Sequence, residues 1–128
     1  MRVLKKAVVI MTLSCLAGCF SPGVVKARLD GDGTFDIRQG QTLELEMESN
    51  PTTGYSWDVA ASENKGVLRQ KRGSKYIPGS DLIGAGGVQI FYFEGLRRGR
   101  AELTFEYRRP WEKDKEPAGR HVILVNVH

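Results

Sequence analysis

The run Thr42-Leu43-Glu44-Leu45-Glu46-Met47-Glu48 alternates apolar and acidic residues without a break. Side chains on a β-strand point to opposite faces in turn, so the run predicts a strand with Leu43, Leu45 and Met47 inward and the three glutamates in water. A helix would scatter the same apolar groups around its axis. A period of two therefore sets the class of structure expected for the chain.

The same pattern recurs on both sides of this strand. Residues 55–59 continue it after a turn, and residues 101–107 alternate with Leu103, Phe105 and Tyr107 inward. Residues 122–127 are apolar on both faces, which is typical of a strand that is covered on both sides or paired deep in a sheet.

Residues 87–94 are rich in β-branched and aromatic side chains and predict a central strand. The pattern leaves two inward faces open, either Phe91 with Phe93 or Val88 with Ile90 and Tyr92. Leu96, after a glycine, is expected to cap the core.

Short alternating strands between Gly, Pro and Asn turns, with no long helical pattern, predict an all-β protein. We expect an immunoglobulin-like antiparallel β-sandwich of about seven strands, without the Cys–Trp–Cys core of antibody domains. In such a sandwich the connecting loops gather at the two ends. About 110 residues are enough for one domain with its own core.

The first residues predict a targeting segment. A basic start precedes a short apolar run that is about half the roughly 20 residues a transmembrane helix needs. The run ends in Leu16-Ala17-Gly18-Cys19, which resembles a bacterial lipobox. We expect residues 1–18 to be a signal peptide, Cys19 to carry a lipid, and residues 19–33 to be the lipidated cysteine and a tether. The alternative is a plain cleavable signal with an incidental cysteine.

Cleavage and lipidation would determine where the mature chain is located and what net charge it carries. The domain, residues 34–128, is expected in the cell envelope, in the periplasm or at the cell surface. Phe20 instead of an aspartate favours the outer membrane if the cell is Gram-negative. Cleavage leaves 16 basic and 15 acidic residues and no free thiol. The nearly neutral balance therefore argues against a nucleic-acid partner. We expect no cofactor, and nothing in the sequence demands more than a monomer.

Three loops differ from ordinary turns. Pro51 stiffens the first, the second is almost free of side chains, and Arg109-Pro110-Trp111 displays two residue types that are enriched at interface hot spots. Each alone would suit a simple connection, and Trp111 alone would suit a core plug. The first loop contains Asn50, Pro51, Thr52, Thr53, Gly54 and Tyr55, and the second contains Gly84, Ala85, Gly86 and Gly87.

Together, in this order and spacing, the three motifs resemble the chagasin family of cysteine peptidase inhibitors, from about Thr34 to the end of the chain. The resemblance implies a tight, reversible, non-covalent inhibitor of papain-like (clan CA) peptidases, with the three loops in the enzyme's cleft. Thr52, Thr53 and Gly54 would cover the catalytic cysteine and histidine. Arg109 and Trp111 would lie on the primed side, and residues 84–87 on the unprimed side, where backbone hydrogen bonds would resemble an added strand.

The sequence offers three alternatives to an inhibitor: an enzyme, a metal-binding protein and a scaffold lipoprotein. His121 and His128 are the only histidines, and no catalytic set with motif support can be assembled, which disfavours an enzyme. The segment Asp30–Asp36 has phenylalanine where a calcium loop needs glycine, so we expect a polar turn and no metal site. A cell-envelope scaffold lipoprotein, binding a non-peptidase partner through the same loops, is the remaining alternative. It could keep Trp111 in its core, whereas an inhibitor needs that side chain exposed beside residues 52–54.

Overall fold

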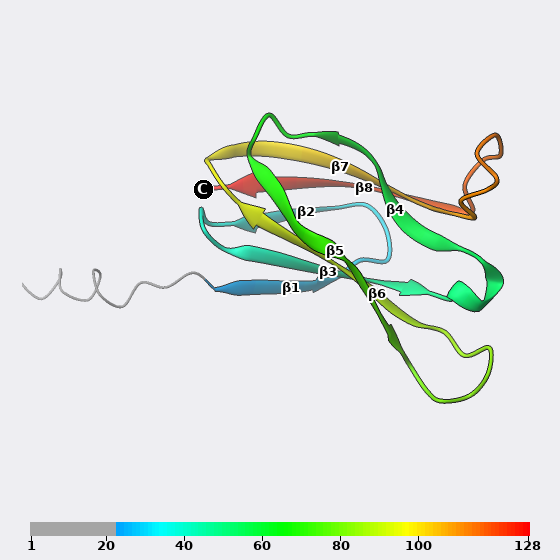
Figure 1. Ribbon diagram of the computed structural model, residues 1–128. Helices are drawn as coiled ribbons and strands as arrows, with labels where there is room; N and C mark the ends of the chain where they lie inside the picture. The colour runs from blue at the N-terminus through cyan, green and yellow to red at the C-terminus, as the bar shows by residue number, and fades with distance from the viewer. Residues whose placement is uncertain (1–22) are drawn as a thin grey trace, which may run out of the picture.

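The computed structural model describes residues 23–128, which form two four-stranded sheets packed face to face (Figure 1). One sheet has the strand order β1-β3-β6-β5 and the other the order β2-β8-β7-β4. The strands are β1 (Val24–Arg28), β2 (Gly33–Ile37), β3 (Thr42–Ser49), β4 (Ser56–Glu63), β5 (Leu68–Pro78), β6 (Gly87–Gly95), β7 (Gly99–Arg108) and β8 (Gly119–Val127). The prediction of an all-β sandwich is confirmed.

The structure has one strand more than the seven expected, and it is not wholly antiparallel. β1 runs parallel to β3, and β2 runs parallel to β8. Val24–Arg28, expected in the tether, alternates between exposed residues and the partly buried Val25 and Ala27, which pack on the core. The sheet therefore begins within the expected tether. Gly33–Ile37 likewise forms β2, so the polar turn expected over Asp30–Asp36 is confined to its first residues.

The core lies between the two sheets. Leu43, Leu45 and Met47 of β3 are fully buried, as the alternation predicts, and Phe105 of β7 packs edge-on against Phe91 with ring centroids 5.0 Å apart. Leu103 and Phe105 are buried as expected, whereas Tyr107 is only partly buried.

Both inward faces proposed for β6 are largely buried, although Val88 of the second face is only partly covered. Phe91 and Phe93 belong to the central core, while Ile90 and Tyr92 lie on the opposite face and are also covered. The guanidinium of Arg72 lies 4.1 Å from the ring centroid of Tyr92. Long charged side chains on the neighbouring strands can cover an apolar face with their stems, which accounts for the burial of the face of β6 that points away from the core.

Leu96 does not cap the core. Its side chain is 41% exposed, in the turn between β6 and β7. The core is closed at this point by Val67, whose backbone carbonyl accepts from the backbone N–H of Leu96.

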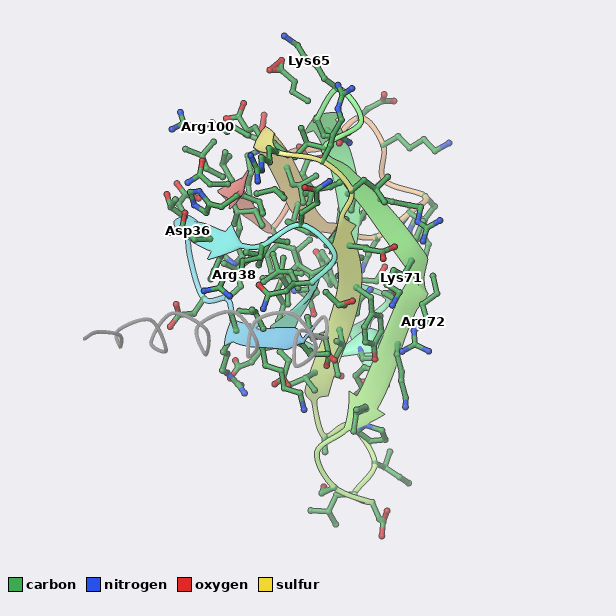
Figure 2. The ribbon with its side chains drawn as sticks, turned by 90° about the vertical axis from the view of Figure 1, so that its left-hand side faces the viewer. Asp36, Arg38, Lys65, Lys71, Arg72 and Arg100 are labelled. Carbon is green, nitrogen blue, oxygen red and sulfur yellow. The ribbon has the colours of Figure 1, made fainter. Side chains whose placement is uncertain are left out.

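The long edge strand β5 accounts for the basic stretch between Lys65 and Ser80. Its pairing with β6 shifts register twice, and Lys71 and Arg72 lie along it (Figure 2). Register shifts and charged side chains on an edge strand oppose edge-to-edge pairing with a strand of another molecule. The basic residues of β5 thus have a structural role at a sheet edge.

Replacement of Phe105 by alanine should destabilise the domain by about 3–5 kcal/mol, because a fully buried ring is lost from between the sheets. Leu96→Ala is the control and should change stability by less than about 0.5 kcal/mol, because Leu96 is exposed. Denaturant unfolding of the two variants measures both effects. Equal losses would contradict the placement of the core.

Candidate functional site

The three loops singled out in the sequence lie at one end of the sandwich (Figure 1). They connect β3 to β4, β5 to β6, and β7 to β8. Each of these connections leaves its first strand at the same end, because β3, β5 and β7 all run toward that end. The expected clustering of the loops therefore follows from the strand directions.

The first loop is a short 3-10 turn over Pro51–Thr53 with Asn50 as its N-cap. The Asn50 side-chain oxygen accepts from the backbone N–H of Thr52, 3.2 Å away, and from the Thr52 hydroxyl. The backbone carbonyl of Asn50 accepts from the Thr53 hydroxyl at 2.7 Å. The two threonine hydroxyls therefore stiffen the turn from within, together with the fixed φ of Pro51.

The turn rests on a column of aromatic rings. The backbone N–H of Asn50 donates to the hydroxyl of Tyr107, 2.9 Å away. The Tyr107 ring stacks on Tyr55 with centroids 5.3 Å apart and lies 4.9 Å from Trp57. The indole N–H of Trp57 in turn donates to the carbonyl of Glu48 at 2.8 Å. The sequence predicted Tyr107 as an inward residue but gave no sign that its hydroxyl holds the first loop.

Direct hydrogen bonds join the three loops. The Asn50 side-chain amide donates to the backbone carbonyl of Gly84 in the second loop at 3.1 Å. The Nε of Arg109 in the third loop donates to the carbonyl of Thr53 at 3.0 Å, and its guanidinium lies 4.6 Å from the centre of the Tyr55 ring. The three motifs therefore form one connected surface.

Trp111 lies on this surface, exposed beside the first loop. Its side chain is 69% accessible, so it is not a core plug. Gly54 has φ +86°, and a Cβ at this position would lie 2.6 Å from Cη2 of the Trp111 indole. The left-handed backbone favours glycine here, and a larger residue would also push the exposed indole out of its position against the first loop. This arrangement is the one expected of an inhibitor and not of a scaffold with a buried Trp111.

The second loop differs in detail from the expected flexible glycine run. Gly87 belongs to β6, and a Cβ there would lie 2.1 Å from the carbonyl oxygen of Ile77, so this glycine serves the pairing of β5 with β6. The backbone N–H of Gly79 donates to the carbonyl of Gly86 and closes the base of the loop. Gly84 and Gly86 are both exposed, and of the two only Gly84 has a left-handed backbone, with φ +81°.

Two apolar residues at the tip of the second loop were missed in the sequence. Leu82 is 76% exposed and Ile83 is fully exposed. Exposed large apolar side chains next to a binding surface are typical of contact residues. Their position immediately before Gly84-Ala85 was the available signal.

The third loop is held at its base by a charged cluster. Arg108 and Arg120 both form ion pairs with Glu106, and the Arg108 guanidinium also donates to the backbone carbonyls of Glu112, Lys113 and Lys115. The hydrogen bonds from Arg120 and then Arg108 lower the pKa of Glu106, and the same contact raises the pKa of Arg120. The carboxylate therefore stays charged and keeps both guanidinium groups in place.

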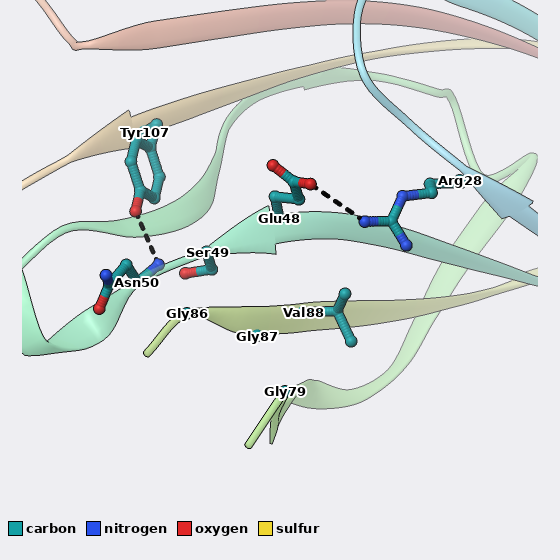
Figure 3. Close-up of a pocket in the computed structure, with 9 residues that line it drawn as sticks. All are labelled: Arg28, Glu48, Ser49, Asn50, Gly79, Gly86, Gly87, Val88 and Tyr107. Carbon is teal, nitrogen blue, oxygen red and sulfur yellow. Dashed lines mark hydrogen bonds and ion pairs between the residues drawn. The ribbon is translucent and has the colours of Figure 1, made fainter. Parts of the chain in front are cut away.

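An open groove of about 610 Å³ lies beside the first two loops (Figure 3). The bond between Asn50 and Tyr107 forms one side, and an ion pair between Arg28 and Glu48 at 3.3 Å forms another. The residues that line it are Arg28, Glu48, Ser49, Asn50, Gly79, Gly86, Gly87, Val88 and Tyr107.

Residues 23–128 bring together no group of three or more His, Cys, Asp or Glu side chains that could hold a metal ion. Nor do they form a helix of the length and apolar character needed to cross a bilayer.

Comparisons with known proteins point to one family. The sequence profile of the chagasin family peptidase inhibitor I42 matches residues 36–125. Chagasin from Trypanosoma cruzi is 28% identical over 100 residues, which are 74% of this chain and 89% of that protein.

Solved structures share the fold. A cysteine protease inhibitor from Entamoeba histolytica superposes with a TM-score of 0.70 at 20% identity, covering 83% of this chain and 96% of that one. PbICP-C, in complex with falcipain-2, superposes with a TM-score of 0.61 at 17% identity, covering 81% of this chain and 99% of that one.

Replacement of Tyr107 by phenylalanine should destabilise the domain by about 1–2 kcal/mol, because the partly buried N–H of Asn50 loses its acceptor. Tyr55→Phe is the matched control. It keeps the stacked ring and should change stability by less than about 0.5 kcal/mol. Denaturant unfolding gives both values. A Tyr107→Phe variant as stable as the control would show that the hydroxyl does not anchor the first loop.

Proposed function

The chain belongs to the chagasin family of peptidase inhibitors, and from this premise we propose that it inhibits papain-like cysteine peptidases by filling the active-site cleft with its three joined loops. The single observation that carries the proposal is the exposed indole of Trp111 against Gly54, beside a first loop that is bonded to both of the others. The membership of a family of inhibitors also sets aside the enzyme hypothesis. The complex of PbICP-C with falcipain-2 supports the class of target.

Each loop has a separate task in this proposal. Thr52, Thr53 and Gly54 cover the catalytic cysteine and histidine of the peptidase. Arg109 and Trp111 contact the primed side of the cleft, where the indole stacks on the enzyme surface. The exposed backbone around Gly84 lies along the unprimed side and offers hydrogen bonds like those of an added strand.

The geometry of the first loop explains why such an inhibitor is not cleaved. The turn is closed by bonds from the N–H of Thr53 to the carbonyl of Asn50 and from the N–H of Gly54 to the carbonyl of Pro51. The carbonyl of Thr53 already accepts from Arg109. Attack by a thiolate needs an accessible carbonyl in the correct orientation, and these carbonyls are held in a turn.

Rigidity also favours tight binding. Ordering a flexible loop on association costs free energy, and a loop that is already ordered avoids most of that cost. Here the hydrogen bonds of Asn50 and the stacked rings of Tyr55 and Tyr107 order the surface before the peptidase arrives. More of the contact energy then appears as affinity.

The proposal includes the place where the inhibitor works. Residues 1–18 as a signal peptide and Cys19 as a lipidated cysteine lie outside the described residues, and the support for them is the lipobox-like sequence. On this basis the protein is a monomeric lipoprotein of the cell envelope, held to the membrane through Cys19. Globomycin treatment of producing cells, which blocks processing of lipoproteins, should accumulate the uncleaved form if the proposal is right.

Titration of papain with the soluble domain, starting after Cys19, tests the inhibition. We expect reversible, stoichiometric inhibition at nanomolar concentration without cleavage of the domain. Trp111→Ala should raise the inhibition constant about 30-fold or more, since a buried tryptophan hot spot contributes about 2–4 kcal/mol. Leu96→Ala, at the opposite end, should inhibit like the wild type. A folded domain that does not inhibit at micromolar concentration would refute the proposal, and an unchanged constant in Trp111→Ala would remove this residue from the contact.

The apolar tip of the second loop should add to the affinity. Because Ile83 is fully exposed in the free protein, Ile83→Ala should leave the unfolding free energy unchanged. It should weaken inhibition roughly tenfold if the side chain becomes buried against the enzyme. Ile77→Ala, on the exposed edge strand, is the control. Equal inhibition constants for both variants and the wild type would place the tip outside the interface.

A further inference from the structure

The end of the sandwich opposite the three loops carries a concentration of basic residues. Three turns lie there, at residues 38–41, 64–67 and 96–98, and they contain no aspartate or glutamate. The three connections that contain the inhibitory loops, in contrast, are nearly balanced in charge, with four acidic and three basic residues. The basic residues of the three turns are Arg38, Lys65, Arg97 and Arg98, and Arg100 follows at the start of β7.

These basic side chains are exposed and available. Among residues 23–128 none of the five forms a salt bridge; Arg97 donates to the carbonyl of Lys65, and Arg100 to the side chain of Asn126. Figure 2 views this end directly and shows Arg38, Lys65 and Arg100 around it.

Four carboxylates lie near the basic turns. Glu94 is neutralised by its ion pair with Arg69. Asp36 is hydrogen-bonded to His128 and stays ionised, and Glu63 lies opposite Glu102 in the sheet. The five basic residues outnumber these three remaining carboxylates, which leaves a surface with an excess of positive charge.

Apolar side chains accompany the charges. Leu96 is 41% exposed between Gly95 and the two arginines, and Val24, at the start of β1, is 53% exposed. Basic residues that surround exposed apolar ones are the composition of a protein surface that contacts a bilayer interface. The exposed part of the Leu96 side chain would become buried at such a bilayer interface.

The path of the chain leads to the same end. Val24 pairs with Thr42, the first residue of β3, so β1 begins at the end opposite the inhibitory loops. Cys19 precedes Gly23 by four residues, a stretch of chain that spans about 14 Å at most. A lipid on Cys19 therefore keeps this end of the sandwich close to the membrane surface.

We propose that the end formed by the turns 38–41, 64–67 and 96–98 is a membrane-facing surface that binds the anionic headgroups of phospholipids. The inference rests on the lipid anchor of the proposed function. Attraction between basic residues and an anionic surface acts within roughly a Debye length, about 8 Å, and the short connection holds the turns within that reach. With this end on the membrane, the inhibitory loops lie on the far side of the domain. The distance between the two ends is about the length of the strands, about 30 Å for the ten residues of β7.

The test uses the mature lipidated protein, reconstituted into vesicles of phosphatidylcholine alone or mixed with phosphatidylglycerol. The lipidated chain has no free thiol, so a fluorophore can be placed at Gln39→Cys among the basic turns, or at Ile83→Cys on the inhibitory loops. A lipid with a quencher on its headgroup reports how close each position lies to the bilayer. We expect several-fold stronger quenching at position 39 than at position 83, and an increase at position 39 when phosphatidylglycerol is present.

Charge reversal separates the basic turns from the anchor. Arg97→Glu with Arg98→Glu should abolish the increase that phosphatidylglycerol causes at position 39. The matched pair Lys113→Glu with Lys115→Glu, on the third loop, should leave it intact. The proposal is overturned by equal quenching at positions 39 and 83, by no response to phosphatidylglycerol, by the same effect of both charge reversals, or by a chain that does not associate with vesicles. Papain titration of the same preparations reports inhibition separately, so failure of the proposed function is recognised independently.

Discussion

The inhibitory surface depends on the hydrogen bonds of one residue, Asn50. Its backbone N–H donates to the hydroxyl of Tyr107, its carbonyl accepts from Thr53, its side-chain oxygen accepts from Thr52, and its amide group donates to Gly84. Each polar group of the residue thus connects the first loop to itself, to the sheet beneath, or to the second loop. An aspartate would keep the cap but lose the donor that reaches the second loop. The order of the binding surface is for this reason a property of the free protein.

The directions of the strands determine which loops lie at each end of the sandwich, and the two ends differ in composition. Because β3, β5 and β7 run toward the same end, their following loops meet there, and the turns that precede β3, β5 and β7 lie at the other end with the start of β1. One end gathers an exposed indole, exposed aliphatic residues and bonded turns. The other gathers guanidinium groups close to the proposed anchor. An inhibitor attached to a membrane needs this separation, since its binding surface has to remain free for a peptidase.

Much of the fold follows from the sequence, because an uninterrupted alternation such as that of residues 42–48 indicates a β-strand and also which of its faces is buried. The alternation predicted the buried faces of β3 and β7, but it failed for Leu96, since an apolar residue in a turn carries no periodicity that tells inside from outside. The alternation also did not predict that Val24–Arg28 pairs in parallel with β3, because the pairing partner of a strand is set by contacts distant in the sequence. The loop motifs indicated the candidate site, and the structure brings the three motifs together at one end of the sandwich. The role of the Tyr107 hydroxyl depends on its contact with Asn50, far away in the sequence, and no local pattern contains it.

The three loops form a rigid surface that is already ordered in the free protein. A crystal structure of the domain bound to papain, compared with the free domain, measures this rigidity. We expect the bonds of Asn50 to Tyr107 and Gly84, and of Arg109 to Thr53, to be the same in the complex. We further expect residues 52–54 to lie over the catalytic cysteine, with Trp111 and Gly84 on opposite sides. A complex in which these bonds are broken, or in which another face of the sandwich meets the enzyme, would contradict these expectations.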